Sequence, residues 1–568
     1  MATAPSPLEA RERELAAFIE RLTAEIEPLH LRHNHAYWRA NLTGDPAASD
    51  EAARLDTEIR TVFARREPYA WLRALEQQGV RDPLLARQLA ILVRAHRGNQ
   101  LEPAAIERMV RIETRLEHRF TVFRAELDGR RVGDNELRRV LAGSDDAAER
   151  RRAWEASKQV GTQVVADLLE LVGLRNEAAR SLGFGDYYAM RLTLDELDEA
   201  ELFALLDDLE RGTRPLFEAY KRGLDARLAA RFGVHPEELR PWHYADPFFQ
   251  EAPAAGLHLD RFFGGEPLER LAERSYADIG LDVRGLLARS DLFEREGKHQ
   301  HAFCLCMDRR DDIRVLCNLR PTEYWMSTLM HELGHAVYDL HIQQGLPFLL
   351  REPAHTLTTE ASAMLFGRFT KSAAWLERHA GASASEARAA GEDCARAIRD
   401  QLLVQTRWML VMCHMERALY RDPARDLDTL WWDLVEEFQR VRRPDPPAAG
   451  ARPVAGARPG AGARPGAGAR RREPDWASKV HFSTAPVYYQ NYMLGEMMAS
   501  QLQGHLRDVV LGGGPGADAR LVSSPEVGAF LVERLYRPGS TLDWRGVLRG
   551  CTGGSLSADA FVEGLAGP

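Results

Sequence analysis

His331-Glu332-Leu333-Gly334-His335 is the stretch from which the fold of this chain is best worked out. Apolar residues recur at helical spacing around it, at Trp325, Leu329, Leu333, Val337 and Leu340. This pattern predicts a helix that ends by Gly345. Because residues four apart share one face of a helix, the two imidazoles can bind one zinc ion, with Glu332 as the base for a water molecule. Gly334 costs about 1 kcal/mol relative to alanine in mid-helix, which predicts that another backbone passes close to it.

A third zinc ligand is needed, because catalytic zinc sites use three protein ligands and keep one position open. Glu360, 25 residues after His335, is the best candidate. It lies in a second stretch of helical periodicity, formed by Leu357, Ala361, Met364, Leu365 and Phe369. We therefore expect two packed helices that hold one zinc ion through His331, His335 and Glu360. The alternative is a buried helix pair whose polar side chains only satisfy one another by hydrogen bonds.

Residues 298–319 predict a β-hairpin within an otherwise helical region. Apolar residues run from Ala302 to Cys306, a polar turn follows at 308–312, and a second apolar run covers 313–319. An extended peptide could pair with the edge of such a hairpin through the backbone of Ala302 and Cys304. The alternative is a surface hairpin with an incidental histidine at position 301.

A second block of chemically suggestive residues lies nearer the C-terminus. It consists of Lys479-Val480-His481, followed by Tyr489 and Tyr492, two tyrosines three residues apart. A stripe of aromatic residues is more often part of a hydrophobic core, so this block depends on the zinc motif for its interpretation.

Together these motifs resemble those of the glutamate-zincin peptidases, and most closely those of the angiotensin-converting-enzyme family of peptidyl-dipeptidases. The thimet-type oligopeptidase family is the second match. The resemblance is strong over about 298–500 and faint elsewhere. It implies a mostly α-helical, two-lobed peptidase with a deep central channel and a small antiparallel hairpin at the active site. It also implies that His481 and Tyr492 bind the oxyanion, that Lys479 and Tyr489 hold the C-terminal carboxylate of the substrate, and that His301 belongs to the strand that aligns the peptide.

Three positions depart from the family pattern. Met364 stands where the family has an acidic residue that orients a zinc histidine, so that hydrogen bond must come from elsewhere. Asn491 stands where an arginine precedes the second tyrosine, which puts chloride activation in doubt. A family glutamine that helps to hold the substrate carboxylate has no clear match near Trp242-His243-Tyr244.

Composition places the chain among mildly acidic globular proteins. The 568 residues include 75 basic and 84 acidic side chains, a formal net charge of −9, which predicts no general attraction to nucleic acid. The six cysteines are too few and too scattered for a disulfide framework. The charged N-terminal stretch lacks a signal-peptide core, and no run of 18 apolar residues predicts a membrane span. We therefore expect a cytoplasmic monomer with no membrane or nucleic-acid partner.

Residues 447–473 interrupt this pattern with Ala, Gly, Pro and Arg in a six-residue repeat. Such a composition has almost no apolar bulk and predicts a disordered insertion. The alternative is a basic arm that recruits anionic partners. We expect residues 1–446 and 474–568 to form one helical domain with two lobes.

The predicted function is hydrolysis of short peptides by a zinc metallopeptidase that binds one Zn²⁺ per chain and releases C-terminal dipeptides. One alternative is an endo-acting oligopeptidase that uses the same site. Two others are a non-catalytic peptide-binding protein and a helical scaffold organised by the basic insertion.

Overall fold

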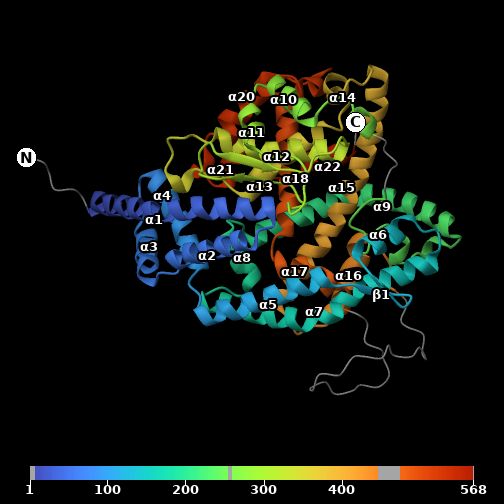
Figure 1. The fold of residues 1–568 in the computed structure, drawn as a ribbon, viewed down its shortest axis with the longest axis horizontal. Coiled ribbons are helices and arrows are strands. Elements are labelled where there is room, and N and C mark those ends of the chain that lie inside the picture. The colour runs from blue at the N-terminus through green and yellow to red at the C-terminus, as the bar shows by residue number, and fades with distance from the viewer. Residues whose placement is uncertain (1–6, 254–258, 445–473, 567–568) are drawn as a thin grey trace, which may run out of the picture.

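The computed structural model describes residues 7–253, 259–444 and 474–566. Most of them are helical, and the strands of this described part form two short antiparallel hairpins (Figure 1). The predicted mostly α-helical fold is confirmed. The predicted insertion at 447–473 lies outside the described residues.

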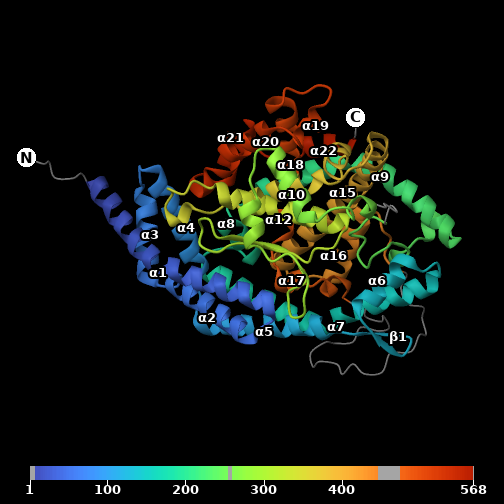
Figure 2. The same cartoon turned by 45° about the horizontal axis from the view of Figure 1, so that its top comes forward.

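Four N-terminal helices lie together at one side of the molecule (Figure 2). They are α1 (Pro7–Thr43), α2 (Pro46–Phe63), α3 (Arg66–Gln78) and α4 (Pro83–Gly98). Their apolar stripes form a hydrophobic cluster that includes Leu15 and Ile26 of α1 and Leu92 of α4. Phe348 and Leu349 join this cluster from a segment far along the chain, so they fasten the N-terminal helices to the rest of the protein.

The remaining helices form the body of the protein. Those before the predicted hairpin are α5 (Pro103–Val122), α6 (Asp134–Gly143), α7 (Ala147–Ser181), α8 (Tyr187–Leu194), α9 (Glu199–Phe232), α10 (Leu268–Asp278) and α11 (Arg284–Arg289). Those after it are α12 (Glu323–His341), α13 (Thr356–Phe369), α14 (Ala373–His379), α15 (Ala384–Arg421), α16 (Leu427–Leu434), α17 (His481–Thr484), α18 (Tyr489–His505), α19 (Ala517–Leu521), α20 (Pro525–Phe530), α21 (Trp544–Thr552) and α22 (Asp559–Ala566). Their main hydrophobic cluster runs from Met109 to Leu565 and draws on both sides of the 445–473 gap.

The predicted hairpin is confirmed as β3 (Phe303–Cys306) paired antiparallel with β4 (Ile313–Leu316). A second hairpin, β1 (Ala125–Leu127) with β2 (Arg130–Val132), was not predicted. Its turn is Asp128-Gly129, and both residues have positive φ, 51° and 77°. Asp-Gly is a typical signal for this kind of tight turn, so the sequence did contain the evidence for this hairpin.

Helix α13 packs against both α12 and α18 at the centre of the body (Figure 1). Helix α12 begins after Thr322, whose side chain caps it, and ends at His341, four residues before Gly345. Gly345 is therefore not the stop, because the backbone is already extended at Ile342. Of the described helices, none is both long and apolar enough to cross a membrane.

Glycines allow these three helices to approach closely. A Cβ added at Gly334 of α12 would lie 2.7 Å from Cα of Ala363 in α13. A Cβ at Gly495 of α18 would lie 3.1 Å from Cβ of Glu360. The predicted close backbone beside Gly334 is thus confirmed, and it belongs to the helix that carries Glu360.

Gly334→Ala should lower the free energy of unfolding by up to about 2 kcal/mol, because overpacking against the Ala363 backbone costs about 1–3 kcal/mol and outweighs the gain of about 1 kcal/mol in helix propensity. Gly173→Ala in α7 is the matched control, since a Cβ there meets nothing within 4 Å. It should raise stability by up to about 1 kcal/mol. Urea denaturation of the two variants checks this, and equal effects of both substitutions would contradict the packing account.

Candidate active site

Two histidines of α12 and a glutamate of α13 converge at the packed face of these helices. Nε2 of His331 lies 3.8 Å from Oε2 of Glu360, and Nε2 of His335 lies 4.0 Å from the same oxygen. Within the described chain, this is the one group of three potential ligands whose donor atoms all lie within 4.8 Å of one another. Two imidazoles and one carboxylate at this separation are a donor set that suits zinc.

Burial sets the protonation of these groups. It lowers the pKa of His331 to about 4 and that of His335 to about 3, so both imidazoles are neutral at pH 7 and have a lone pair to donate. Burial, with a smaller contribution from Glu496, raises the pKa of Glu360 to about 7. The pKa of Glu332 is raised to about 8, first by burial and then by the charge of Glu360. Burial thus disfavours the charged form of both carboxyl groups, and a bound cation would stabilise that charged form.

Thr359 supplies the hydrogen bond that would orient His335 as a metal ligand. Its hydroxyl lies 2.7 Å from Nδ1 of His335. With the Nδ1 proton donated to this hydroxyl, Nε2 is left unprotonated on the side of Glu360. Sequence analysis missed Thr359, although it directly precedes Glu360, because it considered only the acidic residue expected at position 364.

The β3 strand passes beside the candidate base. The backbone N–H of Cys304 interacts with Glu332 and lowers the pKa of its carboxyl against the larger effect of burial. One edge of β3 pairs with β4, while residues 302–306 also line a large cavity. The side chain of Asn34 in α1 donates to the carbonyls of Cys306 (3.2 Å) and Met307 (3.1 Å), at the far end of the strand. His301 precedes the strand, is exposed, and does not line that cavity.

The metal-ligand candidates open onto this cavity, which has a volume of about 1890 Å³. Helices α1, α2 and α4 supply one part of its wall, and β3, α12 and α13 supply another. His331, Glu332, His335 and Glu360 all line it. The cavity is large enough for a peptide of several residues.

The second predicted block lies near the first. The rings of His481 and Tyr489 are 4.8 Å apart, and those of Tyr489 and Tyr492 are 5.9 Å apart. Burial raises the pKa of Tyr492, and the charge of Glu360 raises it further, so this phenol lies within electrostatic reach of the third ligand candidate. Burial, together with the charge of Lys479, lowers the pKa of His481 to about 4, which leaves its imidazole neutral.

Lys479 lies in a cage of aromatic rings and donates to one polar partner. Its Nζ is 5.3 Å from the ring centre of Phe248, 5.1 Å from that of Trp408 and 5.8 Å from that of Tyr489. It donates a 2.7 Å hydrogen bond to Oε1 of Gln250. Burial lowers the pKa of Lys479 to about 8. Gln250 is thus a glutamine beside Lys479, a few residues beyond the 242–244 region in which sequence analysis found no clear match.

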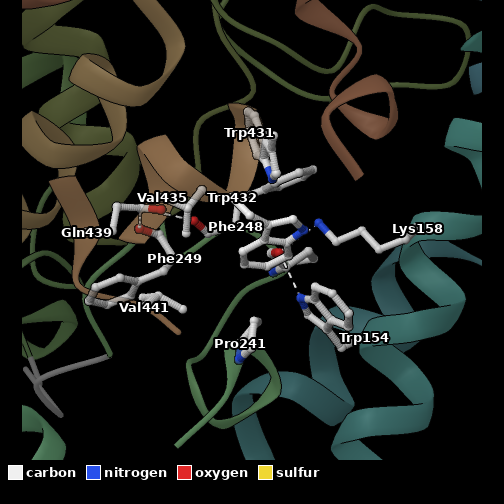
Figure 3. Close-up of a pocket in the computed structure, with 11 residues that line it drawn as sticks. Trp154, Lys158, Pro241, Phe248, Phe249, Trp431, Trp432, Val435, Gln439 and Val441 are labelled. Carbon is white, nitrogen blue, oxygen red and sulfur yellow. Dashed lines mark hydrogen bonds between the residues drawn. The ribbon is translucent and has the colours of Figure 1, made fainter. Parts of the chain in front are cut away.

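The loop that carries Gln250 is held from several directions. Lys158 and Trp154 of α7 both donate to the carbonyl of Pro247, at 2.8 and 3.0 Å. Gln439 donates to the carbonyl of Phe249 at 2.7 Å. Figure 3 shows Lys158 and Trp154 to one side of Phe248 and Gln439 to the other, around a cavity of only about 20 Å³. The residues around this small cavity hold the loop that carries Gln250, and the cavity itself is too small for a peptide.

Two further residues of the segment that carries Tyr489 and Tyr492 line the large cavity of about 1890 Å³. Tyr488 lines the cavity, and burial followed by the charge of Glu360 raises the pKa of its phenol. Asn491, which replaces the expected arginine, also lines the cavity and is buried. Sequence analysis missed Tyr488 because it considered only the pair of tyrosines three residues apart.

Comparison with known proteins adds one finding to this geometry. A family model, Peptidase_M2, described as angiotensin-converting enzyme, matches residues 9–238. The predicted resemblance is confirmed. Residues 9–238 are therefore similar to the angiotensin-converting-enzyme family. A search among curated proteins finds no match.

The family match covers a part of the chain that the motifs did not emphasise. It spans α1 to α9 and ends before β3 and α12, whereas the predicted resemblance was strongest at 298–500. The match therefore supports the metallopeptidase without including the candidate ligands, and it does not bear on the thimet-type family.

Thr359→Val should weaken zinc binding about 10- to 100-fold, because it removes the hydroxyl that orients His335 and keeps the side-chain shape. Thr359→Ser is the matched control, since it keeps the hydroxyl, and its affinity should stay within a few-fold of the parent. Competition with a zinc chelator measures both. Equal affinity in the two variants would show that Thr359 does not tune the metal site.

Proposed function

We propose that the chain is a zinc peptidyl-dipeptidase that acts on short peptides. The observation that supports this best is the group of His331, His335 and Glu360 with Glu332 beside it on the wall of a peptide-sized cavity. The similarity of residues 9–238 to the angiotensin-converting-enzyme family agrees with it. An endo-acting oligopeptidase that uses the same residues is the second candidate.

One zinc ion per chain would be held by His331, His335 and Glu360. When bound, zinc polarises a carbonyl oxygen and makes a neighbouring water molecule more acidic. Glu332, which follows the first ligand and faces the backbone of Cys304, would take the proton of the attacking water and deliver it to the leaving amine.

The charge that develops on the carbonyl oxygen needs neutral donors. His481 and Tyr492 would donate to it, and such donors contribute about 3 kcal/mol each to stabilisation of the transition state. Burial keeps both in the neutral form, which supports this role. Tyr488, which lines the cavity and whose pKa is raised by burial and by the charge of Glu360, is a further phenol that could donate.

The substrate backbone would pair with β3. Ala302 and Cys304 lie on the cavity side of the hairpin and can bind an extended peptide with little sequence preference. His301 would contribute at the start of this strand.

Dipeptide release is favoured by the buried Lys479. An ammonium within an aromatic cage, hydrogen-bonded to a neutral amide and next to Tyr489, is suited to a free C-terminal carboxylate. Lys479, Gln250 and Tyr489 would therefore fix the end of the peptide and so determine which bond reaches Glu332.

The chain has six free cysteines, which supports a reducing compartment such as the cytosol. We further propose that residues 1–446 and 474–568 act as one two-lobed domain, as a monomer and without nucleic-acid partners.

Glu332→Gln should lower kcat about a thousandfold and keep stoichiometric zinc, because the proton carrier is lost while the three ligands remain. Glu360→Ala should lose both zinc and activity, since it removes a ligand. Metal analysis and peptide hydrolysis are measured on the same preparations. Near-parental turnover of Glu332→Gln would exclude Glu332 as the base.

Amidation of a substrate's C-terminus should lower kcat/KM by an amount that corresponds to about 2–4 kcal/mol of transition-state stabilisation, because the buried ammonium of Lys479 is left without its anion. Lys479→Met keeps the aliphatic chain in the aromatic cage and should abolish the difference between free and amidated peptides. Gln250→Glu should have a similar effect, because its carboxylate would pair with Lys479. Mass spectrometry of the products separates the two candidates: equal cleavage of both peptides at internal bonds favours the oligopeptidase.

A further inference from the structure

The link between the His481 segment and α18 contains a strained residue. Val487 has a φ of +56° and is 1% exposed. A β-branched residue rarely adopts this left-handed conformation, because its side chain crowds the backbone. Such a conformation persists only where surrounding contacts hold it, and it is found most often at functional sites.

Two buried side chains hold both peptide groups of Val487. The N–H of Val487 donates to Oε1 of Glu416 at 2.8 Å. Its carbonyl accepts from Nε2 of Gln490 at 2.6 Å. Glu416 is 2% exposed and Gln490 is 1% exposed, so water does not compete for these bonds. The conformation of Val487 is therefore set by its contacts and not by its own preference.

Glu416 is an unusual residue for its surroundings. It projects from α15 into the core, and within the described chain it forms no ion pair. Against the larger effect of burial, the charge of Arg175 lowers the pKa of Glu416, but the guanidinium of Arg175 binds the carbonyls of Phe482 and Ser483 at 3.2 and 2.8 Å. An apolar side chain would cost less to bury than a carboxyl group. The carboxyl of Glu416 has the backbone of Val487 as its hydrogen-bond partner.

Val487 joins the segment of His481 to the start of α18, so its conformation affects where the tyrosines of α18 lie. Before it, Arg175 holds the backbone that directly follows His481. After it come Tyr488 and the first turn of α18, which carries Tyr492. If Val487 relaxed to a negative φ, the chain direction into α18 would change, and with it the placement of Tyr488 and Tyr492 relative to Glu360.

We propose that Glu416 is a positioning residue of the active site: by holding Val487 in the left-handed conformation, it sets Tyr488 and Tyr492 against the metal-ligand cluster. Glu416 does not touch the substrate and acts through the backbone. This inference rests on the proposed function, because the tyrosines matter only if they face the reacting carbonyl.

The test is a double-mutant cycle of Glu416→Met and Val487→Gly. Methionine resembles glutamate in shape but offers no oxygen to the Val487 N–H. Glycine adopts positive φ without side-chain strain, so it removes the need for Glu416. Glu416→Gln is the matched control, because the amide oxygen can still accept the hydrogen bond; burial raises the pKa of Glu416 to about 8, so a neutral side chain is a fair substitute.

Glu416→Met should lower kcat at least tenfold, with KM changed less than threefold and zinc content unchanged. Glu416→Gln should stay within about threefold of the parent. In the Val487→Gly background, Glu416→Met should change kcat less than threefold, because the backbone no longer depends on the carboxyl group. An equal loss in both backgrounds, or an equal loss for Met and Gln, would overturn the proposal.

Equilibrium unfolding of the four proteins of the double-mutant cycle provides a readout that does not require activity. The shift in denaturation midpoint caused by Glu416→Met should be smaller in the Val487→Gly background than in the parent. If the parent hydrolyses no peptide but this coupling is present, the proposed function fails while the Glu416–Val487 link stands. Absence of the coupling overturns the link even in a fully active enzyme.

Discussion

The site depends on one close contact, the packing of α12 on α13 through Gly334. The two histidines come from α12 and the glutamate from α13, so their donor atoms converge only if the helix backbones approach within the width of a missing side chain. Gly495 of α18 repeats this arrangement on the other side of Glu360. The same packing that completes the core therefore fixes the geometry of the candidate ligands, and a ligand set built on rigid helices is held more precisely than one built on loops.

Burial controls the chemistry of the site as much as geometry does. It keeps His331, His335 and His481 neutral, and it raises the pKa values of Glu332, Glu360 and Tyr492. Each shift favours the uncharged form of the group. The neutral histidines therefore offer no positive charge to balance the carboxylates of Glu332 and Glu360. A bound divalent cation would supply that charge, and it would lower the pKa values of the two carboxyl groups again.

Sequence analysis succeeded where periodicity or spacing carries the information. Helices α12 and α13, the β3–β4 hairpin and the close neighbour of Gly334 all follow from local patterns. Gln250 could not be found in this way, because it lies on an irregular loop that only tertiary contacts bring to Lys479. Thr359 and Glu416 act through single hydrogen bonds to residues 24 and 71 positions away, and no local pattern encodes such a pairing. The Asp128-Gly129 turn was a local signal that was overlooked.

The most direct test of the account is X-ray absorption spectroscopy at the zinc edge of the purified, zinc-loaded protein. The account predicts nitrogen and oxygen ligands at about 2.0–2.2 Å, with the scattering of two imidazoles and no sulfur. This result is discriminating, because Cys304 and Cys306 line the same cavity as His331 and His335. A zinc–sulfur distance of about 2.3 Å would move the metal to the β3 strand and contradict the ligand set of His331, His335 and Glu360.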